Sequence, residues 1–185
     1  MRMDLTKKIV LSGDYEDIVE INRKFYIVDK KDRIAVLPYT VSSEGLLDKI
    51  GVAEDWNYID DVKILTLING YLSTDDSTDL VAANRILFEI IGVNITDAKK
   101  WAYLGRVYNN LSSDSGIKIY AVNISDIKIH ENVENMEERK KFIVMDSSKV
   151  IQTDEILFLS SYIRLFQHFY CQSLIKDTFK TGKNE

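Results

Sequence analysis

The sequence predicts one α+β domain spanning all 185 residues, an α/β/α sandwich in which a mixed β-sheet lies between helices. Three observations lead to this prediction. Strand-like runs dominate the first 72 residues and recur between 101 and 145, the hydrophobic period becomes helical after Ser77, and a long apolar helix is expected near the C-terminus. Hydrophobic residues make up 45% of the chain, which is enough for a sizeable core.

The N-terminal part, about 1–52, is predicted to consist of strands. Two of them, at about 25–29 and 33–41, are expected to form a hairpin around a charged turn, because both are rich in β-branched and aromatic residues. Pro38 predicts an edge position for the second strand, since proline lacks the N–H that an inner ladder uses. A shorter strand is expected around 46–52.

A strand and a helix are predicted next. The apolar run over 63–72 is strand-like, with Gly70 as a candidate bulge. Aliphatic residues then recur at helical spacing up to Gly92, which is the expected C-terminal stop. Ser77 or Asp76 is expected to cap the start of this helix.

Three further strands and a long helix complete the prediction. Strands at 101–108 and 117–124 are expected to pair, because turn-forming residues separate them. The charged segment 131–141 is predicted to be a loop or short helix, with a strand at 142–145 after it. The helix predicted over about 154–178 has apolar positions on more than one stripe, so we expect it to pack on its own sheet and on a partner.

Composition excludes several classes of protein. With 24 basic and 29 acidic residues, the net charge of -5 argues against nucleic acid or an anionic membrane as the main partner. No apolar run approaches the length of a membrane span, the single Cys171 cannot form an internal disulfide, and the N-terminus does not resemble a signal peptide. We therefore expect a cytoplasmic protein. The many Ile, Lys and Asn residues are typical of an A/T-rich genome, such as that of a low-GC bacterium or one of its phages.

Common catalytic motifs are absent from the sequence. The eight glycines form neither of the two glycine-rich phosphate loops, and no serine lies in a G-x-S-x-G turn. His130 and His168 are far apart in the sequence, and no cysteine pair has zinc spacing. His168 has aromatic neighbours, so we expect it to be a packed or interfacial helix residue.

The segment 70–93 carries the most specific pattern in the chain. Two stretches carry it, NGYLS at 69–73 and AANRILFEIIGV at 82–93, and they contain Gly70, Arg85, Glu89 and Gly92. This text resembles the box of the Nudix hydrolases: Gly, five residues, Glu, seven residues, then Arg-Glu-aliphatic-any-Glu-Glu-any-Gly-aliphatic. The resemblance extends over 63–127 and implies a Nudix-like mixed sheet between helices, with metal-dependent hydrolysis of a diphosphate as the family's activity.

The departures from this box fall at the family's metal ligands. Ile86 and Ile90 stand where two of the three clustered glutamates belong, and Ser77 stands where the first box glutamate belongs. Residues four apart share a helical face, and isoleucine offers no oxygen to magnesium. We therefore predict no metal, no cofactor and no catalytic residues. If the chain were active, Glu89 and Arg85 would be the residues that the resemblance implies, with Mg²⁺ as the metal.

Two alternatives stay open at this site. Asp75, Asp76 and Asp79 crowd the turn before the helix, where they could cap it, face solvent, or supply the missing carboxylates. Glu89 could be a remnant of the catalytic set or only the i+4 ion-pair partner of Arg85.

The sequence therefore predicts a non-catalytic Nudix-fold protein that serves as a structural or binding component of a larger assembly, such as a virion. The alternatives are a divergent metal-dependent hydrolase of nucleoside diphosphates linked to another group, and a nucleotide-binding sensor. Other protein subunits are the expected partners. The candidate interface residues on the C-terminal helix are Tyr162, Phe166, Phe169 and Tyr170, which could equally complete the domain's own core.

Overall fold

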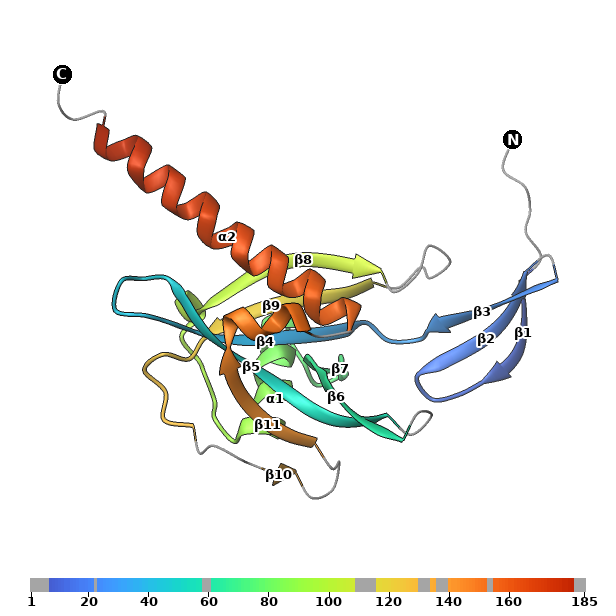
Figure 1. Ribbon diagram of the computed structural model, residues 1–185. Coiled ribbons are helices and arrows are strands. Elements are labelled where there is room, and N and C mark those ends of the chain that lie inside the picture. The colour runs from blue at the N-terminus through green and yellow to red at the C-terminus, as the bar shows by residue number, and fades with distance from the viewer. Residues whose placement is uncertain are drawn as a thin grey trace.

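Two β-sheets and two α-helices form the described part of the chain (Figure 1). The structure, a computed structural model, describes residues 7–21, 23–57, 61–108, 116–129, 134–135, 140–152 and 155–181. The elements are β1 (Lys7–Ser12), β2 (Glu16–Ile21), β3 (Lys24–Asp29), β4 (Arg33–Val41), β5 (Leu47–Asn57), β6 (Val62–Thr66), β7 (Ile68–Tyr71), α1 (Asp79–Ile91), η1 (Ala98–Lys100), β8 (Trp101–Tyr108), β9 (Gly116–Asn123), β10 (Glu134–Asn135), β11 (Lys140–Asp146), η2 (Ser147–Gln152) and α2 (Ile156–Thr181).

Within these residues the main sheet has eight strands and is mixed. Its order is β10-β11-β5-β4-β9-β8, with β6 paired to β5 and β7 paired to β4. β4 and β9 run parallel, whereas β8 and β9 are antiparallel neighbours, which confirms the predicted pairing of 101–108 with 117–124. The strand predicted at 142–145 lies within β11, while most of 131–141 is outside the described residues.

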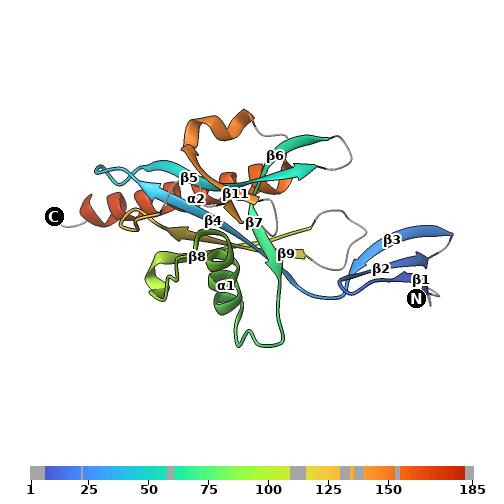
Figure 2. The same ribbon diagram turned by 90° about the horizontal axis from the view of Figure 1, so that it is seen from below.

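The two helices lie on opposite faces of the main sheet (Figures 1 and 2). The alternation of side chains along β4 shows why. Ile34 and Val36 belong to the hydrophobic cluster that α1 completes, whereas Ala35 and Leu37 belong to the cluster that includes Phe158 of α2. The predicted α/β/α sandwich with a long C-terminal helix is therefore confirmed.

The hairpin predicted between 25–29 and 33–41 is wrong. β3 pairs with β2 in a separate sheet, and β4 pairs with strands of the main sheet. The edge position predicted from Pro38 is also wrong, because β4 lies between β5 and β9. The backbone carbonyl of Tyr39 accepts a hydrogen bond on the β9 side of the strand. Because the backbone polar groups of successive strand residues point to opposite sides, the nitrogen of Pro38 points toward β5 and β7. There the ladder with β7 ends at Val36 and the ladder with β5 begins at Tyr39, so the missing N–H falls in the gap.

The single strand predicted over 63–72 is in fact two strands. β6 pairs with β5, β7 pairs with β4, and Leu67 lies between them with its side chain buried. Gly70 is not a bulge, because it pairs with Ile34 in regular register. The polypeptide therefore changes partners just before the segment that resembles the Nudix box.

Helix α1 begins and ends close to the predicted positions. Its N-cap is Thr78, whose Oγ1 accepts the N–H of Val81 at 3.2 Å, so neither Ser77 nor Asp76 is the cap. Gly92 ends the helix as predicted, with φ of 68°, a left-handed conformation that glycine adopts readily. The same backbone turn would strain a residue with a side chain.

Helix α2 starts beside Glu155, whose carboxylate accepts the N–H groups of Leu157 and Phe158 at 2.9 and 2.6 Å. It continues beyond the main sheet and away from the body of the molecule (Figure 1). At the other end of the molecule, the separate sheet β1-β2-β3 projects from the body. No helix within the described ranges is long and apolar enough to cross a membrane.

Candidate functional site

A cleft of about 470 Å³ lies over the face of α1 that resembles the Nudix box. Arg85, Ile86, Glu89 and Ile90 line it from the helix, and β7 and the loop that follows it form another wall. Tyr15, in the turn after β1, lines the cleft as well. The structure therefore places Gly70, Arg85, Ile86, Glu89 and Ile90 on one surface, whereas Gly92 does not line it.

Arg85 is the centre of the polar contacts in this cleft. Its Nε and Nη2 donate to the two carboxylate oxygens of Asp76 at 3.0 and 2.8 Å. Nη1 donates to Glu89 Oε1 at 2.8 Å, and Nη2 also reaches the backbone carbonyl of Tyr71 at 2.9 Å. The guanidinium thus ties the turn before α1, the helix itself and β7 together.

Asp76 is an ionised, nearly buried partner of Arg85. Its side chain is only 3% exposed, and it also accepts the backbone N–H of Ser73 at 2.7 Å. The hydrogen bonds from Arg85 lower the pKa of the Asp76 carboxyl, and the same contact raises the pKa of Arg85. Asp76 is thus neither the helix cap nor a solvated turn residue.

Ile86 and Ile90 form an apolar floor where the family's box has glutamates. They are 2% and 6% exposed and belong to the hydrophobic cluster beneath α1. Ile86 lies directly against Gly70: a Cβ built on the glycine would be 3.0 Å from Ile86 Cγ1. Glycine at position 70 therefore allows α1 to approach β7 closely. Close packing, and not the predicted bulge, explains the glycine at this position.

The acidic residues around this cleft contact cationic side chains or are exposed. No group of three or more His, Cys, Asp or Glu residues in the described part of the chain is placed to hold a metal ion. Asp76 is paired with Arg85, and Asp79 accepts a hydrogen bond from Lys118 at 2.9 Å. Asp75 is exposed. The donor set that Mg²⁺ needs, about six oxygens, does not fit these residues.

Aromatic and cationic side chains gather at the other end of the cleft. Tyr15 stacks on Tyr71 with ring centres 4.6 Å apart, and Lys31 Nζ lies 4.9 Å from the centre of the Tyr15 ring. Arg33 lies 5.5 Å from the Tyr71 ring, and its buried Nε has no hydrogen-bond partner among the described residues. No sequence pattern indicated this group, because 56 positions separate the two tyrosines and only the fold brings them together.

The aromatic residues singled out on the C-terminal helix line a groove of about 370 Å³ beside Leu46. Tyr162 and Phe169 pack partly against the core, and the Phe169 ring meets Tyr39 edge-on at 5.3 Å. Phe166 and Tyr170 are exposed. The four residues thus share one groove but differ in how much of each belongs to the chain's own core.

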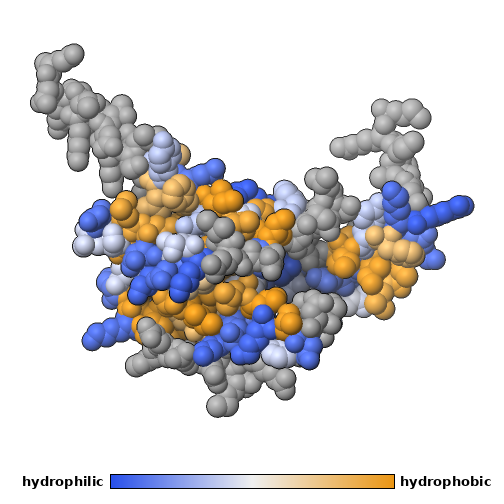
Figure 3. Space-filling view, in the orientation of Figure 1, coloured by the Kyte–Doolittle hydropathy of each residue, from blue (hydrophilic) through white to orange (hydrophobic). Residues whose placement is uncertain are grey.

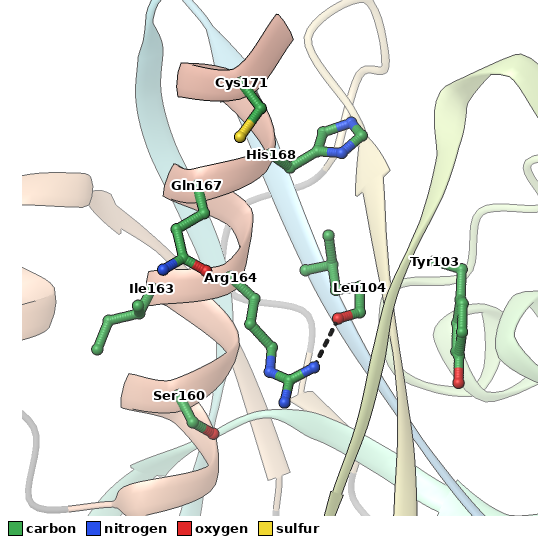
Figure 4. Close-up of a pocket in the computed structure, with 8 residues that line it drawn as sticks. All are labelled: Tyr103, Leu104, Ser160, Ile163, Arg164, Gln167, His168 and Cys171. Atoms are coloured by element: carbon green, nitrogen blue, oxygen red, sulfur yellow. Dashed lines mark hydrogen bonds between the residues drawn. The ribbon is translucent and has the colours of Figure 1, made fainter.

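A third pocket, of about 560 Å³, lies between α2 and β8 (Figure 4). Arg164 extends from the helix toward the strand, and its Nη1 donates to the carbonyl of Leu104 at 2.9 Å. The next residue, Gly105, has φ of 104° and lies at a register shift in β8. A side chain there would collide with the Arg164 guanidinium, so glycine makes room for this link between helix and sheet.

Comparison with known proteins supports the fold. No protein-family model matches the sequence, and no curated protein gives a significant match. Among solved structures, the chain resembles an ADP compounds hydrolase with a TM-score of 0.66 and 15% identity, over 91% of this chain and 94% of that one. It resembles the Nudix domain of Shewanella oneidensis NrtR, solved with ADP ribose, with a TM-score of 0.57 and 15% identity, over 74% and 86%.

A third similar structure is the C-terminal domain of mouse MUTYH, solved in complex with human PCNA. The TM-score is 0.54 and the identity 8%, over 75% of this chain and 89% of that one. The similarity to Nudix proteins in this group shows that the chain has the Nudix fold, as the segment 63–127 indicated.

Proposed function

We propose that this chain is a non-catalytic Nudix-fold protein that works by binding other protein subunits within an assembly. One observation carries the proposal: buried Ile86 and Ile90 occupy the positions at which the family's box has glutamates. Two of the acidic residues nearby, Asp76 and Glu89, both contact Arg85. The cleft is therefore built around an arginine and an apolar floor.

This arrangement works against metal-assisted hydrolysis. Such a reaction needs a divalent ion that polarises the phosphoryl oxygen and lowers the pKa of an attacking water. Bringing Asp76 to a metal would break its two hydrogen bonds to Arg85 and leave that edge of the half-buried guanidinium without its partner. Neither isoleucine can supply a replacement oxygen.

The groove beside Leu46 supports the binding side of the proposal. Phe166 and Tyr170 present large aromatic surface there, and exposed aromatic residues that line a groove are typical of protein interfaces. The MUTYH domain of similar structure was solved in complex with PCNA, so a partner protein is compatible with this fold. A virion is the assembly that we propose first, in keeping with the Ile-, Lys- and Asn-rich composition.

The decisive experiment is a hydrolysis assay on the purified chain. ADP-ribose, dinucleoside polyphosphates and nucleoside triphosphates are incubated with Mg²⁺ or Mn²⁺, and the products are separated by chromatography. We expect no turnover. Hydrolysis that disappears in the Glu89→Gln variant would refute the proposal, because it would assign catalysis to this cleft. An active Nudix hydrolase assayed in parallel controls for the substrates.

A nucleotide-binding sensor is the second candidate, and the aromatic end of the cleft favours it. Tyr15 and Lys31 line the cleft, where the Lys31 ammonium could meet a phosphate and a base could take its place over the exposed Tyr15 ring. The NrtR Nudix domain was solved with ADP ribose. Calorimetric titration with ADP-ribose tests this candidate. Binding that Tyr15→Ala weakens, without hydrolysis, would favour the sensor over the assembly component.

A further inference from the structure

The outward face of α2 carries a row of apolar side chains that the domain leaves largely exposed. Ile156 is 78% exposed, Ile163 47%, Phe166 57% and Tyr170 59%. Leu159 lies in the same row and is half-buried. We call these five residues the outer seam. Figure 3 shows apolar side chains at the surface along the described part of this helix.

The outer seam has the spacing of a coiled coil. Ile156, Ile163 and Tyr170 are seven residues apart, and Leu159 and Phe166 follow the first two by three, which gives positions a and d of a heptad. At 3.6 residues per turn the five side chains fall within an arc of about 80°. A narrow a/d stripe of this kind is the surface with which one helix packs along another.

The residues that hold α2 on its own sheet lie on the opposite side of the helix. Leu157, Phe158 and Leu165 are buried in the core. Figure 4 shows the same division at neighbouring positions, where Arg164 extends toward β8 and Ile163 points away from the strand. The domain's own packing therefore leaves most of the outer seam exposed.

The flanks of the outer seam are uncharged. Between 156 and 171 the one Lys, Arg, Asp or Glu is Arg164, which faces β8 and donates to a backbone carbonyl. The positions beside the seam, equivalent to e and g of the heptad, are Ser160, Gln167, Tyr162 and Phe169. Coiled coils usually select a different partner through opposite charges at e and g. Here no such charges reject a like copy, although the chain as a whole has a net charge of -5.

We propose that α2 pairs with α2 of a second copy of this chain, as a parallel two-stranded contact along the outer seam. Isoleucine at the first two a positions with leucine at d favours two parallel strands. The helix also continues past the main sheet, so the body leaves room for a second helix beside it. This inference rests on the proposed function, since it identifies a partner subunit.

The mass of the full chain in solution tests the pairing. Light scattering during size exclusion and sedimentation velocity are measured over a hundredfold range of concentration. We expect a dimer that Ile163→Glu weakens by about a hundredfold, because a carboxylate would be buried against its own copy. Phe166→Gln serves as a milder variant if the first does not fold. The matched control is Val81→Glu, an exposed apolar position on α1 across the sheet, which should leave the dimer unchanged.

Cross-linking tests the direction of the helices. Tyr170→Cys in a Cys171→Ser background should form an intermolecular disulfide on mild oxidation, because equivalent a positions are adjacent in a parallel pair. In an antiparallel pair centred near Ile163, the two cysteines would be about 20 Å apart and would not join. Failure to cross-link, with the dimer intact, overturns the parallel arrangement.

Two results would overturn the pairing itself. One is a wild-type chain that stays monomeric at all concentrations, and the other is a dimer that the seam variants leave unchanged. Neither result bears on the hydrolysis assay, so the non-catalytic proposal is judged separately. A monomer that enters a particle by binding another protein would contradict pairing with a second copy. It would still support the proposal that the chain is a component of an assembly.

Discussion

Arg85 and Asp76 hold the candidate site in its present form. The sequence allowed Glu89 to be an ion-pair partner of Arg85, and the structure shows this pair at 2.8 Å on the exposed rim. An exposed i+4 pair stabilises a helix by only about 0.3–0.5 kcal/mol. The contact with Asp76 is different, because two parallel hydrogen bonds join the groups and the carboxylate is nearly buried. Asp76 is thus the more consequential acid of the two for stability.

We expect Asp76→Asn to destabilise the folded chain by about 2 kcal/mol, because the variant loses a charge-assisted pair and leaves Arg85 without its main acceptor. Urea denaturation followed by circular dichroism measures the free energy of unfolding. Asp75→Asn is the matched control, since Asp75 is exposed, and it should change stability by less than about 0.5 kcal/mol. Equal effects of the two substitutions would contradict the assignment.

The same pair predicts a dependence of stability on pH. The pKa of Asp76 is lowered in the folded chain, whereas an aspartate carboxyl in the unfolded chain has a pKa of about 4. The pair therefore contributes fully above that pH and is lost as the pH falls through the lower folded pKa. The difference in unfolding free energy between wild type and Asp76→Asn should be constant from about pH 5, a unit above the unfolded pKa, up to about pH 7. It should shrink below about pH 4.

At the scale of elements, the cap of α1 gives a sharp test. Thr78→Ala removes the oxygen that accepts the Val81 N–H, so we expect a loss of about 1 kcal/mol in the free energy of unfolding. Ser77→Ala is the control, because the neighbouring serine is exposed and is not the cap. If Ser77→Ala proves the more costly in urea denaturation, the helix begins one residue earlier than the structure shows.

The contact between α1 and β7 predicts a coupling between Gly70 and Ile86. Gly70→Ala should cost about 1–3 kcal/mol, because the new methyl would press on the Ile86 side chain. Ile86→Ala should cost about 2–5 kcal/mol by leaving a cavity. The double variant should cost less than the sum of both, since the methyl on residue 70 fills part of that cavity. Strict additivity in a double-mutant cycle would show that the two residues do not pack together.

The sequence predicted the elements whose signals are local. The helical period and Gly92 located α1, and turn residues separated the strands that became β8 and β9. Strand pairing depends on contacts between distant residues, so the expected hairpin between β3 and β4 was wrong. The edge position predicted from Pro38 was wrong for the same reason. An inner strand accepts this proline because it lies in a gap between two hydrogen-bond ladders, which no local pattern reveals.

The candidate site was predictable only in part. The resemblance to the Nudix box identified the helix face that carries Arg85, Ile86 and Ile90, and the structure places that face in a cleft. The role of Asp76 was missed, because a carboxylate in a turn has the same sequence signal whether it caps, faces solvent or binds a guanidinium nine residues away. Pairing of this kind is decided by the path of the loop, which depends on tertiary packing.

At the scale of the whole molecule, the described residues form a sandwich and a projecting sheet that meet at Tyr15 and Tyr71. Tyr15, in the turn between β1 and β2, stacks on Tyr71 of β7, and the Tyr71 hydroxyl donates to Glu16 at 3.2 Å. Of the apolar residues in the projecting sheet, Val19 is buried, whereas Phe25 and Ile27 are exposed. The described residues of this sheet therefore bury little apolar surface, and we expect the tyrosine contact to hold the sheet in position.

We expect Tyr15→Ala to loosen the projecting sheet without affecting the sandwich. An aromatic pair contributes about 0.5–1.5 kcal/mol, so amide hydrogen exchange in β1, β2 and β3 should speed up by roughly two- to tenfold, while exchange in the main sheet stays the same. Tyr108→Ala, at an exposed tyrosine at the end of β8, is the control and should leave the projecting sheet unchanged. Faster exchange throughout the main sheet would show that the two sheets unfold as one unit. Unchanged exchange in β1 to β3 would show that contacts other than the Tyr15 stack hold the projecting sheet in place.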